Sequence, residues 1–126
     1  MTGYRLDTQI VEGAETLVVI IEGPLDFESS LALLREADAR QPSRLIVDAS
    51  KFRPDFIGPR QVRKLAAVWR DSSVFRSAWV AAVAPSPVVY GLCLLFQWWV
   101  KAEGRFAVFR SHRAALNWLH GRDAKH

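Results

Sequence analysis

The 126-residue sequence has little cysteine, little histidine and no long apolar run, and each shortage excludes a class of function. The single cysteine, Cys93, cannot form a disulfide within the chain, which is compatible with a reducing cytoplasm. The three histidines, His112, His120 and His126, are confined to the C-terminal helix and tail, and the eight-residue separation of His112 and His120 does not fit a pair of metal ligands, so we expect no metal site. The longest apolar run, Val88 to Val100, is shorter than the roughly 20 residues of a membrane-spanning helix. Because the first residues also carry no secretory signal pattern, we expect a cytoplasmic protein.

Sequence motifs for nucleotide binding, nucleophilic catalysis and nucleic-acid recognition are missing as well. The formal charge is +4, and the basic residues are spread along the chain, which does not indicate nucleic-acid binding. Asp48 and Asp55 are the best-placed carboxylates, near the carboxyl end of a predicted strand, but no histidine is close to them in sequence. We therefore expect a protein that is not an enzyme and that uses no cofactor.

Apolar patterning predicts one domain over residues 1–126, built from alternating strands and helices. Repeated strand–helix–strand units require right-handed crossovers and a mostly parallel sheet, and an opening hairpin adds an antiparallel edge. Asp26 and Ser111 are predicted helix N-caps, and Gly121 is expected to end the last helix. The predicted strands are 4–11, 16–22, 44–49, 78–84 and 105–109, and the predicted helices are 27–40, 59–71, 87–100 and 112–120, with an inward stripe of Phe27, Leu31, Leu34 and Ala37 in the first.

The helix from Pro87 to Val100 carries more apolar surface than one buried face can use. At 100° per residue, one broad face holds Val88, Leu92, Leu95, Phe96 and Trp99. The other face holds Tyr90, Leu94, Trp98 and Lys101. A second internal layer or a homodimer contact explains such a helix, and a surface for a ligand or lipid is the alternative.

Several segments, in order and spacing, carry a resemblance to a known family. They are Gly23-Pro24-Leu25-Asp26, Leu45 to Gly58, Val83-Ala84-Pro85, Tyr90-Gly91-Leu92 with Phe96-Gln97, Val108-Phe109-Arg110, and Ala115 to Leu119. The first two resemble the STAS domain of anti-sigma factor antagonists, and the rest are similar to the small bacterial SpoIIAA-like proteins, also called STAS/SEC14 domain proteins. The resemblance implies an α/β fold with a mixed, mostly parallel sheet of four or five strands and helices packed mainly on one side.

One segment departs from the STAS pattern. Antagonists of this family read D-S-S-G where this chain reads Asp55-Phe56-Ile57-Gly58, so Ile57 occupies the position of the phosphorylated serine. We expect no phosphorylation in this segment, because neither Phe56 nor Ile57 has a hydroxyl group. Ser50, at the end of the preceding strand, is a weaker alternative acceptor.

Two surfaces are candidates for function. Arg60, Arg63, Lys64 and Arg70 share one side of the helix 59–71, either as a solvated face or as a docking surface for an acidic protein or an anionic lipid headgroup. The leading hypothesis is a non-enzymatic regulatory or protein-binding domain that works as a homodimer and uses Tyr90, Leu94 and Trp98, with this basic side as a second surface. The alternative is a SEC14-like carrier or sensor of an apolar small molecule or lipid, with a cavity lined by Phe56, Ile57, Tyr90 and Trp98.

Overall fold

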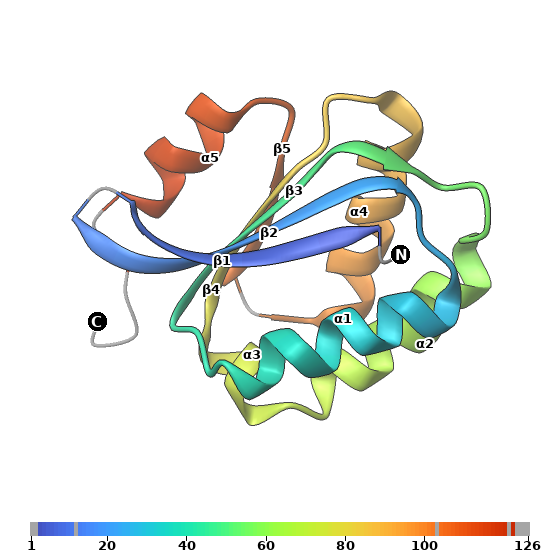
Figure 1. The fold of residues 1–126 in the computed structure, drawn as a ribbon, viewed down its shortest axis with the longest axis horizontal. Helices are drawn as coiled ribbons and strands as arrows, with labels where there is room; N and C mark the ends of the chain where they lie inside the picture. The colour runs from blue at the N-terminus through green and yellow to red at the C-terminus, as the bar shows by residue number, and fades with distance from the viewer. Residues whose placement is uncertain (1–2, 12, 103, 121, 123–126) are drawn as a thin grey trace.

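The protein folds around a single mixed sheet with strand order β1-β2-β3-β4-β5, as seen in the computed structural model (Figure 1). The structure describes residues 3–11, 13–102, 104–120 and 122. The strands are β1 (Tyr4–Val11), β2 (Ala14–Pro24), β3 (Arg44–Arg53), β4 (Trp79–Val83) and β5 (Phe106–Phe109). The helices are α1 (Phe27–Ala39), α2 (Pro59–Arg70), α3 (Ser73–Ser77), α4 (Pro87–Val100) and α5 (His112–Leu119).

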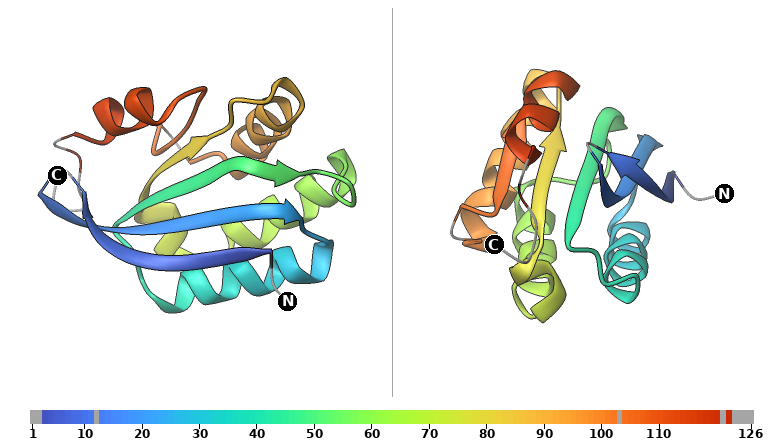
Figure 2. Two further views of the ribbon diagram at one scale, coloured as in Figure 1. Left: turned by 45° about the horizontal axis from the view of Figure 1, so that its top comes forward. Right: turned by 90° about the vertical axis from the view of Figure 1, so that its left-hand side faces the viewer.

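The sheet has one antiparallel pair, β1 with β2, and three parallel pairs. Strand residues alternate between its two faces. The larger core lies on the face that α1, α2, α3 and α4 cover, where Leu45 and Val80 pack against Trp69 and Phe75. On the opposite face α5 covers β4 and β5, and Leu119 is completely buried there. Figures 1 and 2 show α1 and α5 on opposite sides of the twisted strands. The predicted α/β fold class is confirmed.

Helix starts follow the predicted capping signals. The Asp26 carboxylate accepts a hydrogen bond from the Ser29 amide at 2.7 Å, and the Ser111 hydroxyl caps α5 by accepting from the Ala114 amide at 3.2 Å. Proline begins both α2 and α4, where its missing N–H is no loss. The predicted stop at Gly121 lies outside the described residues.

The inward stripe of α1 was predicted only in part. Of its predicted residues, Ala37 is buried and Leu34 packs against the core, but the other buried residues of the helix are Ser30 and Leu33. The polar residue is accepted inside because the Ser30 hydroxyl donates a hydrogen bond to the Asp26 carbonyl at 2.8 Å, so no polar group is left unsatisfied.

Two further elements differ from the predicted pattern. Strand β3 continues to Arg53, because after a bulge β2 resumes pairing with it through Gly23 and Pro24. The five-residue helix α3 has too few apolar residues for a periodic signal. Its Phe75 is nevertheless buried and stacks on Trp69 with ring centroids 4.0 Å apart.

Candidate functional site: an apolar cavity under α4

Helix α4 is apolar on all sides, and its inward stripe decides which residues remain outside. Val89, Cys93, Phe96 and Val100 contact the core at a spacing of i, i+4, i+7 and i+11. Val88, which the helical projection places on one face with Phe96 and Trp99, precedes this stripe by one residue and is 64% exposed. Phe96 and Trp99 from that face pack against the core, whereas Val88 does not.

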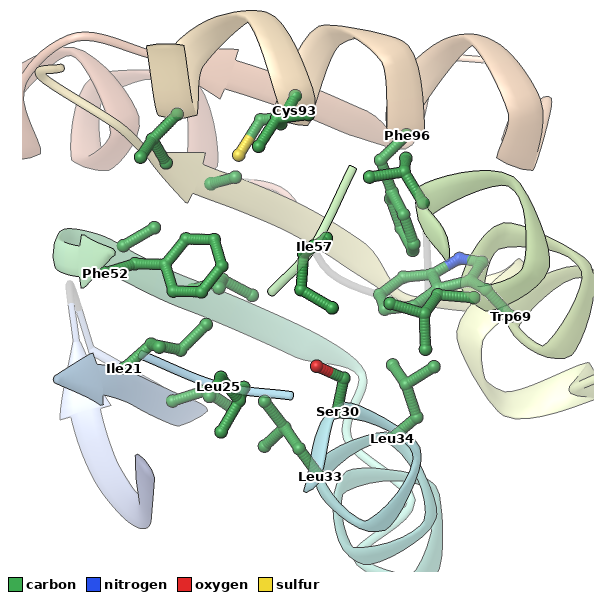
Figure 3. A pocket seen from close by; sticks show the side chains of 18 of the residues that line it. Ile21, Leu25, Ser30, Leu33, Leu34, Phe52, Ile57, Trp69, Cys93 and Phe96 are labelled. Atoms are coloured by element: carbon green, nitrogen blue, oxygen red, sulfur yellow. The ribbon is translucent and has the colours of Figure 1, made fainter. Parts of the chain in front are cut away.

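A cavity of about 160 Å³ lies between this stripe of α4 and the sheet. Its walls come from β2, β3, β4, β5, α1, α2, α4 and the loops before α1 and α2 (Figure 3). The lining residues are Val19, Ile21, Leu25, Ser30, Leu33, Leu34, Ala37, Leu45, Val47, Ala49, Phe52, Ile57, Val62, Leu65, Trp69, Ala82, Val89, Leu92, Cys93, Phe96 and Phe106. Protein interiors are normally close-packed, and a dry apolar cavity of roughly 150 Å³ is large enough to bind benzene.

The cavity offers almost no polar group to a ligand. The Ser30 hydroxyl already donates to the Asp26 carbonyl, and the Trp69 ring is held by Phe75 and by an edge-on contact with Phe96, with ring centroids 5.4 Å apart. The Trp69 indole N–H finds no hydrogen-bond partner among the described residues. Burial raises the pKa of the Cys93 thiol to about 11, so Cys93 is neutral at physiological pH. The site is therefore suited to a neutral hydrocarbon-like molecule.

Ile57 reaches the cavity from the segment between β3 and α2. Its side chain is buried in the wall, whereas the neighbouring Phe56 is 62% exposed. At the end of this segment the Gly58 amide donates to the Gln61 side-chain oxygen at 3.0 Å, which fixes the start of α2. Ile57 is thus part of the apolar wall.

The structure separates the four residues that were expected to line one cavity. Of these, only Ile57 lines it. Phe56 points to the surface, Tyr90 is half-buried with the Arg110 guanidinium 5.2 Å from its ring centroid, and Trp98 is 72% exposed. The expectation for Phe56, Tyr90 and Trp98 as cavity walls is wrong, because α4 turns Trp98 away from its inward stripe.

Trp98 and Leu94 instead line an open groove on the outer side of α4. Gln97 and Lys101 complete the groove together with residues that lead into β5. The Gln97 amide donates to the Phe106 carbonyl at 3.0 Å, which ties α4 to that strand. The predicted contact residues Leu94 and Trp98 are therefore brought together at the surface, as a partner-binding face requires.

The basic side of α2 has the predicted pattern, with Arg60, Arg63 and Lys64 exposed and the apolar residues inward. Two of these cations also cover aromatic rings of neighbouring helices. The Arg63 guanidinium lies 4.6 Å from the Trp99 ring centroid, and the Lys64 ammonium lies 5.9 Å from that of Phe27. Part of the basic side thus stabilises the helix layer over the cavity.

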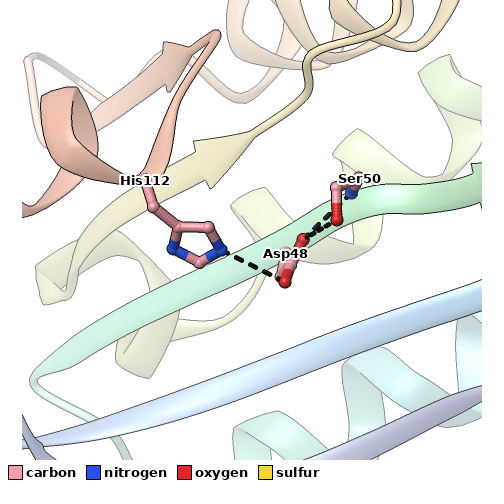
Figure 4. Close-up of polar contacts among 3 residues, drawn as sticks. All are labelled: Asp48, Ser50 and His112. Carbon is pink, nitrogen blue, oxygen red and sulfur yellow. Dashed lines mark hydrogen bonds and ion pairs between the residues drawn. The ribbon is translucent and has the colours of Figure 1, made fainter.

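Asp48, Ser50 and His112 form a polar cluster on the α5 side of the sheet, and the sequence did not predict the contact with His112. Asp48 accepts a hydrogen bond from the Ser50 hydroxyl at 2.6 Å, and its other oxygen lies 3.2 Å from His112 Nε2 (Figure 4). Burial alone would raise the pKa of Asp48, but hydrogen bonds from Ser50 and His112 outweigh it and lower that pKa. The carboxylate stands between the serine and the histidine, so His112 is not placed to take the Ser50 proton as the base of a hydrolase triad does.

Two other kinds of site were sought in the described part of the chain. It holds no group of three histidine, cysteine or acidic side chains that could bind a metal ion. Within the same residues, no helix has the length and apolarity to cross a membrane.

Comparison with known proteins identifies the fold. No protein-family model matches the chain, and no curated protein matches it. Among solved structures it is similar to an uncharacterised protein of the DUF3478 family with a SpoIIAA-like fold, from Shewanella loihica PV-4. The two share 18% sequence identity, the match covers 94% of this chain and 95% of the other, and the TM-score is 0.64. The chain therefore has a SpoIIAA-like fold, as its sequence resemblance implies.

Proposed function

We propose that this SpoIIAA-like domain is a non-enzymatic binding protein that holds a small apolar molecule in the cavity under α4. The supporting observation is the cavity itself, about 160 Å³ of space walled almost entirely by hydrocarbon side chains. Water gains little in such a space, because the lining offers it few hydrogen-bond partners, whereas an apolar molecule regains dispersion contacts. A carrier or sensor is the role that matches this chemistry.

The volume also limits the ligand. Pockets for drug-sized molecules measure roughly 300–1,000 Å³, whereas this cavity measures about 160 Å³. The ligand is therefore about the size of one aromatic ring or a short hydrocarbon chain, and a complete long-chain lipid does not fit. Since Ile57 replaces the phosphoacceptor serine of the STAS pattern, we further propose that binding is not switched by phosphorylation in the segment from Asp55 to Gly58.

A titration with benzene, toluene and hexane tests this function. The melting temperature and the tryptophan fluorescence are measured at each ligand concentration. We expect stabilisation that increases with ligand concentration, because these probes bind the folded state alone. Cys93→Leu occupies part of the cavity and should weaken the effect, whereas Val68→Leu enlarges a partly exposed α2 residue outside the cavity and should leave it unchanged. Equal stabilisation of both variants, or none for the wild type, overturns the proposal.

A second candidate function is protein contact through the outer side of α4. It is favoured by the exposure of Trp98 at 72% and Leu94 at 41%, since large aromatic residues are common anchors of interfaces. Trp98→Glu would place a charge in such a contact. If α4 forms a homodimer, wild type should sediment as a dimer and the variant as a folded monomer. A monomeric wild type, or a Trp98→Glu variant that remains dimeric, contradicts a homodimer through α4.

A further inference from the structure

A cluster of arginines and tryptophans lies on the α5 side of the sheet, away from the cavity. We call Arg44, Arg105, Arg122, Trp79 and Trp118 the arginine cluster. Arg44 opens β3 two residues before Ile46, which packs under α5, and therefore points to the same face; its register partner on β4 is Trp79. The guanidinium groups of Arg105 and Arg122 lie 4.5 and 5.5 Å from the Trp79 ring centroid. Two cations therefore lie beside one indole, and Arg44 starts the neighbouring strand on the same face of the sheet.

Arg44 is an unusual member of this cluster, because it is charged and only 2% exposed. Its Nε and Nη2 atoms have no hydrogen-bond partner among the described residues. A buried cation is strongly destabilising unless an anion or several acceptors compensate it. No carboxylate among the described residues forms an ion pair with Arg44.

The other two arginines also keep positive charge without a carboxylate partner in the described part of the chain. Arg105 donates to the Ser77 carbonyl at 3.2 Å, and Arg122 donates to the Trp118 carbonyl. Arg122 also stacks over the Trp118 ring, with its guanidinium 4.8 Å from the centroid. Because both are only partly buried, they form the outer side of the cluster, and Arg44 forms its inner end.

We propose that the arginine cluster binds an oxyanion, and that the phosphate group of a small molecule or free phosphate is its ligand. A guanidinium presents parallel N–H donors that match two oxygens of a phosphate or carboxylate. Three positive charges are balanced better by a doubly charged phosphate than by a single carboxylate. The flanking indoles lower the local dielectric, which strengthens the attraction between the anion and Arg44. This site is independent of the apolar cavity, which lies across the sheet.

Melting curves of the full chain in increasing inorganic phosphate, at constant ionic strength held with chloride, test the proposal. Wild type should become more stable with phosphate. Arg44→Met removes the inner cation and should weaken the apparent Kd for phosphate about tenfold or more, the usual loss for a charged hydrogen-bond partner. Without phosphate the same variant should be at least as stable as wild type, because replacing an unpaired buried charge by an apolar side chain relieves its cost.

Controls separate this site from general charge effects. Arg35→Met removes an exposed arginine of α1 on the other side of the sheet and should retain the wild-type response. If Arg44→Met does not fold, Arg122→Met provides the test at a half-buried position and should also weaken phosphate binding. Acetate distinguishes the two oxyanion classes, and a response to acetate equal to or larger than that to phosphate overturns the assignment to phosphate. A wild type that responds to neither anion, or arginine-cluster variants that respond like wild type, overturn the proposal.

Discussion

Whether Cys93→Leu raises or lowers the free energy of unfolding depends on whether free space lies under α4. An empty cavity of 160 Å³ costs about 4 kcal/mol, at roughly 24 cal/mol per Å³. Leucine in place of Cys93 extends the side chain into this space and buries about two more carbon groups. At about 0.8 kcal/mol per buried methylene, Cys93→Leu should raise the free energy of unfolding by about 1.5 kcal/mol. In a close-packed core the same change would instead cost about 1–3 kcal/mol.

Urea denaturation at 25 °C measures this difference, provided that the slope m is the same for both proteins. Ala66→Leu is the matched control, because Ala66 is completely buried on α2 but does not line the cavity. That variant should lose about 1–3 kcal/mol through overpacking. Destabilisation of Cys93→Leu to the same extent as Ala66→Leu would refute the reasoning, since it would mean that no free space adjoins Cys93.

Three further predictions concern stability and titration. Leu119→Ala should lower the free energy of unfolding by about 2–5 kcal/mol in a denaturant titration, because Leu119 is completely buried on the sheet-facing side of α5, and an unchanged midpoint would contradict this. The reaction of Cys93 with a disulfide reagent should be slow in the native state and should accelerate about tenfold per pH unit up to pH 11, because the thiolate is the nucleophile; a native rate equal to that in urea would disprove it. His112→Ala should raise the pKa of Asp48 in an NMR titration. An Asp48 pKa that does not change in this variant would show that His112 does not act on the carboxylate. Because the pKa of Asp48 is lower in the folded state, the carboxylate stabilises the fold above the unfolded-state pKa of about 3.9, and this stabilisation is lost as the pH falls through the folded-state pKa.

Most of the fold was predictable because its signals are local. The β-branched runs around Val19 and Val47 specify buried strands, and Asp26 and Ser111 mark helix starts through their own hydrogen bonds. The inward stripes of α1 and α4 were less predictable. Ser30 looks polar in sequence, and α4 is apolar at nearly every position, so periodicity alone could not choose between Val88 and Val89.

The candidate sites depend on contacts between distant residues, which local patterns do not encode. Ile57 was predicted as a cavity residue from the resemblance, but the cavity volume depends on how side chains from seven elements and two loops pack together. Asp48 and His112 are 64 positions apart and meet only because α5 crosses back over the sheet. Arg44 stands at the first position of a strand, where sequence gives no sign of burial.

The proposed function requires that a small apolar molecule occupies the cavity under α4. The most direct measurement is a set of NMR cross-relaxation contacts between toluene and the methyl groups of the isotope-labelled protein. We expect contacts from toluene to Ile57, Leu33 and Ile21, which line the cavity, and none to the exposed Ile10. Contacts confined to Leu94 in the outer groove of α4, or no contacts at all, would contradict the account.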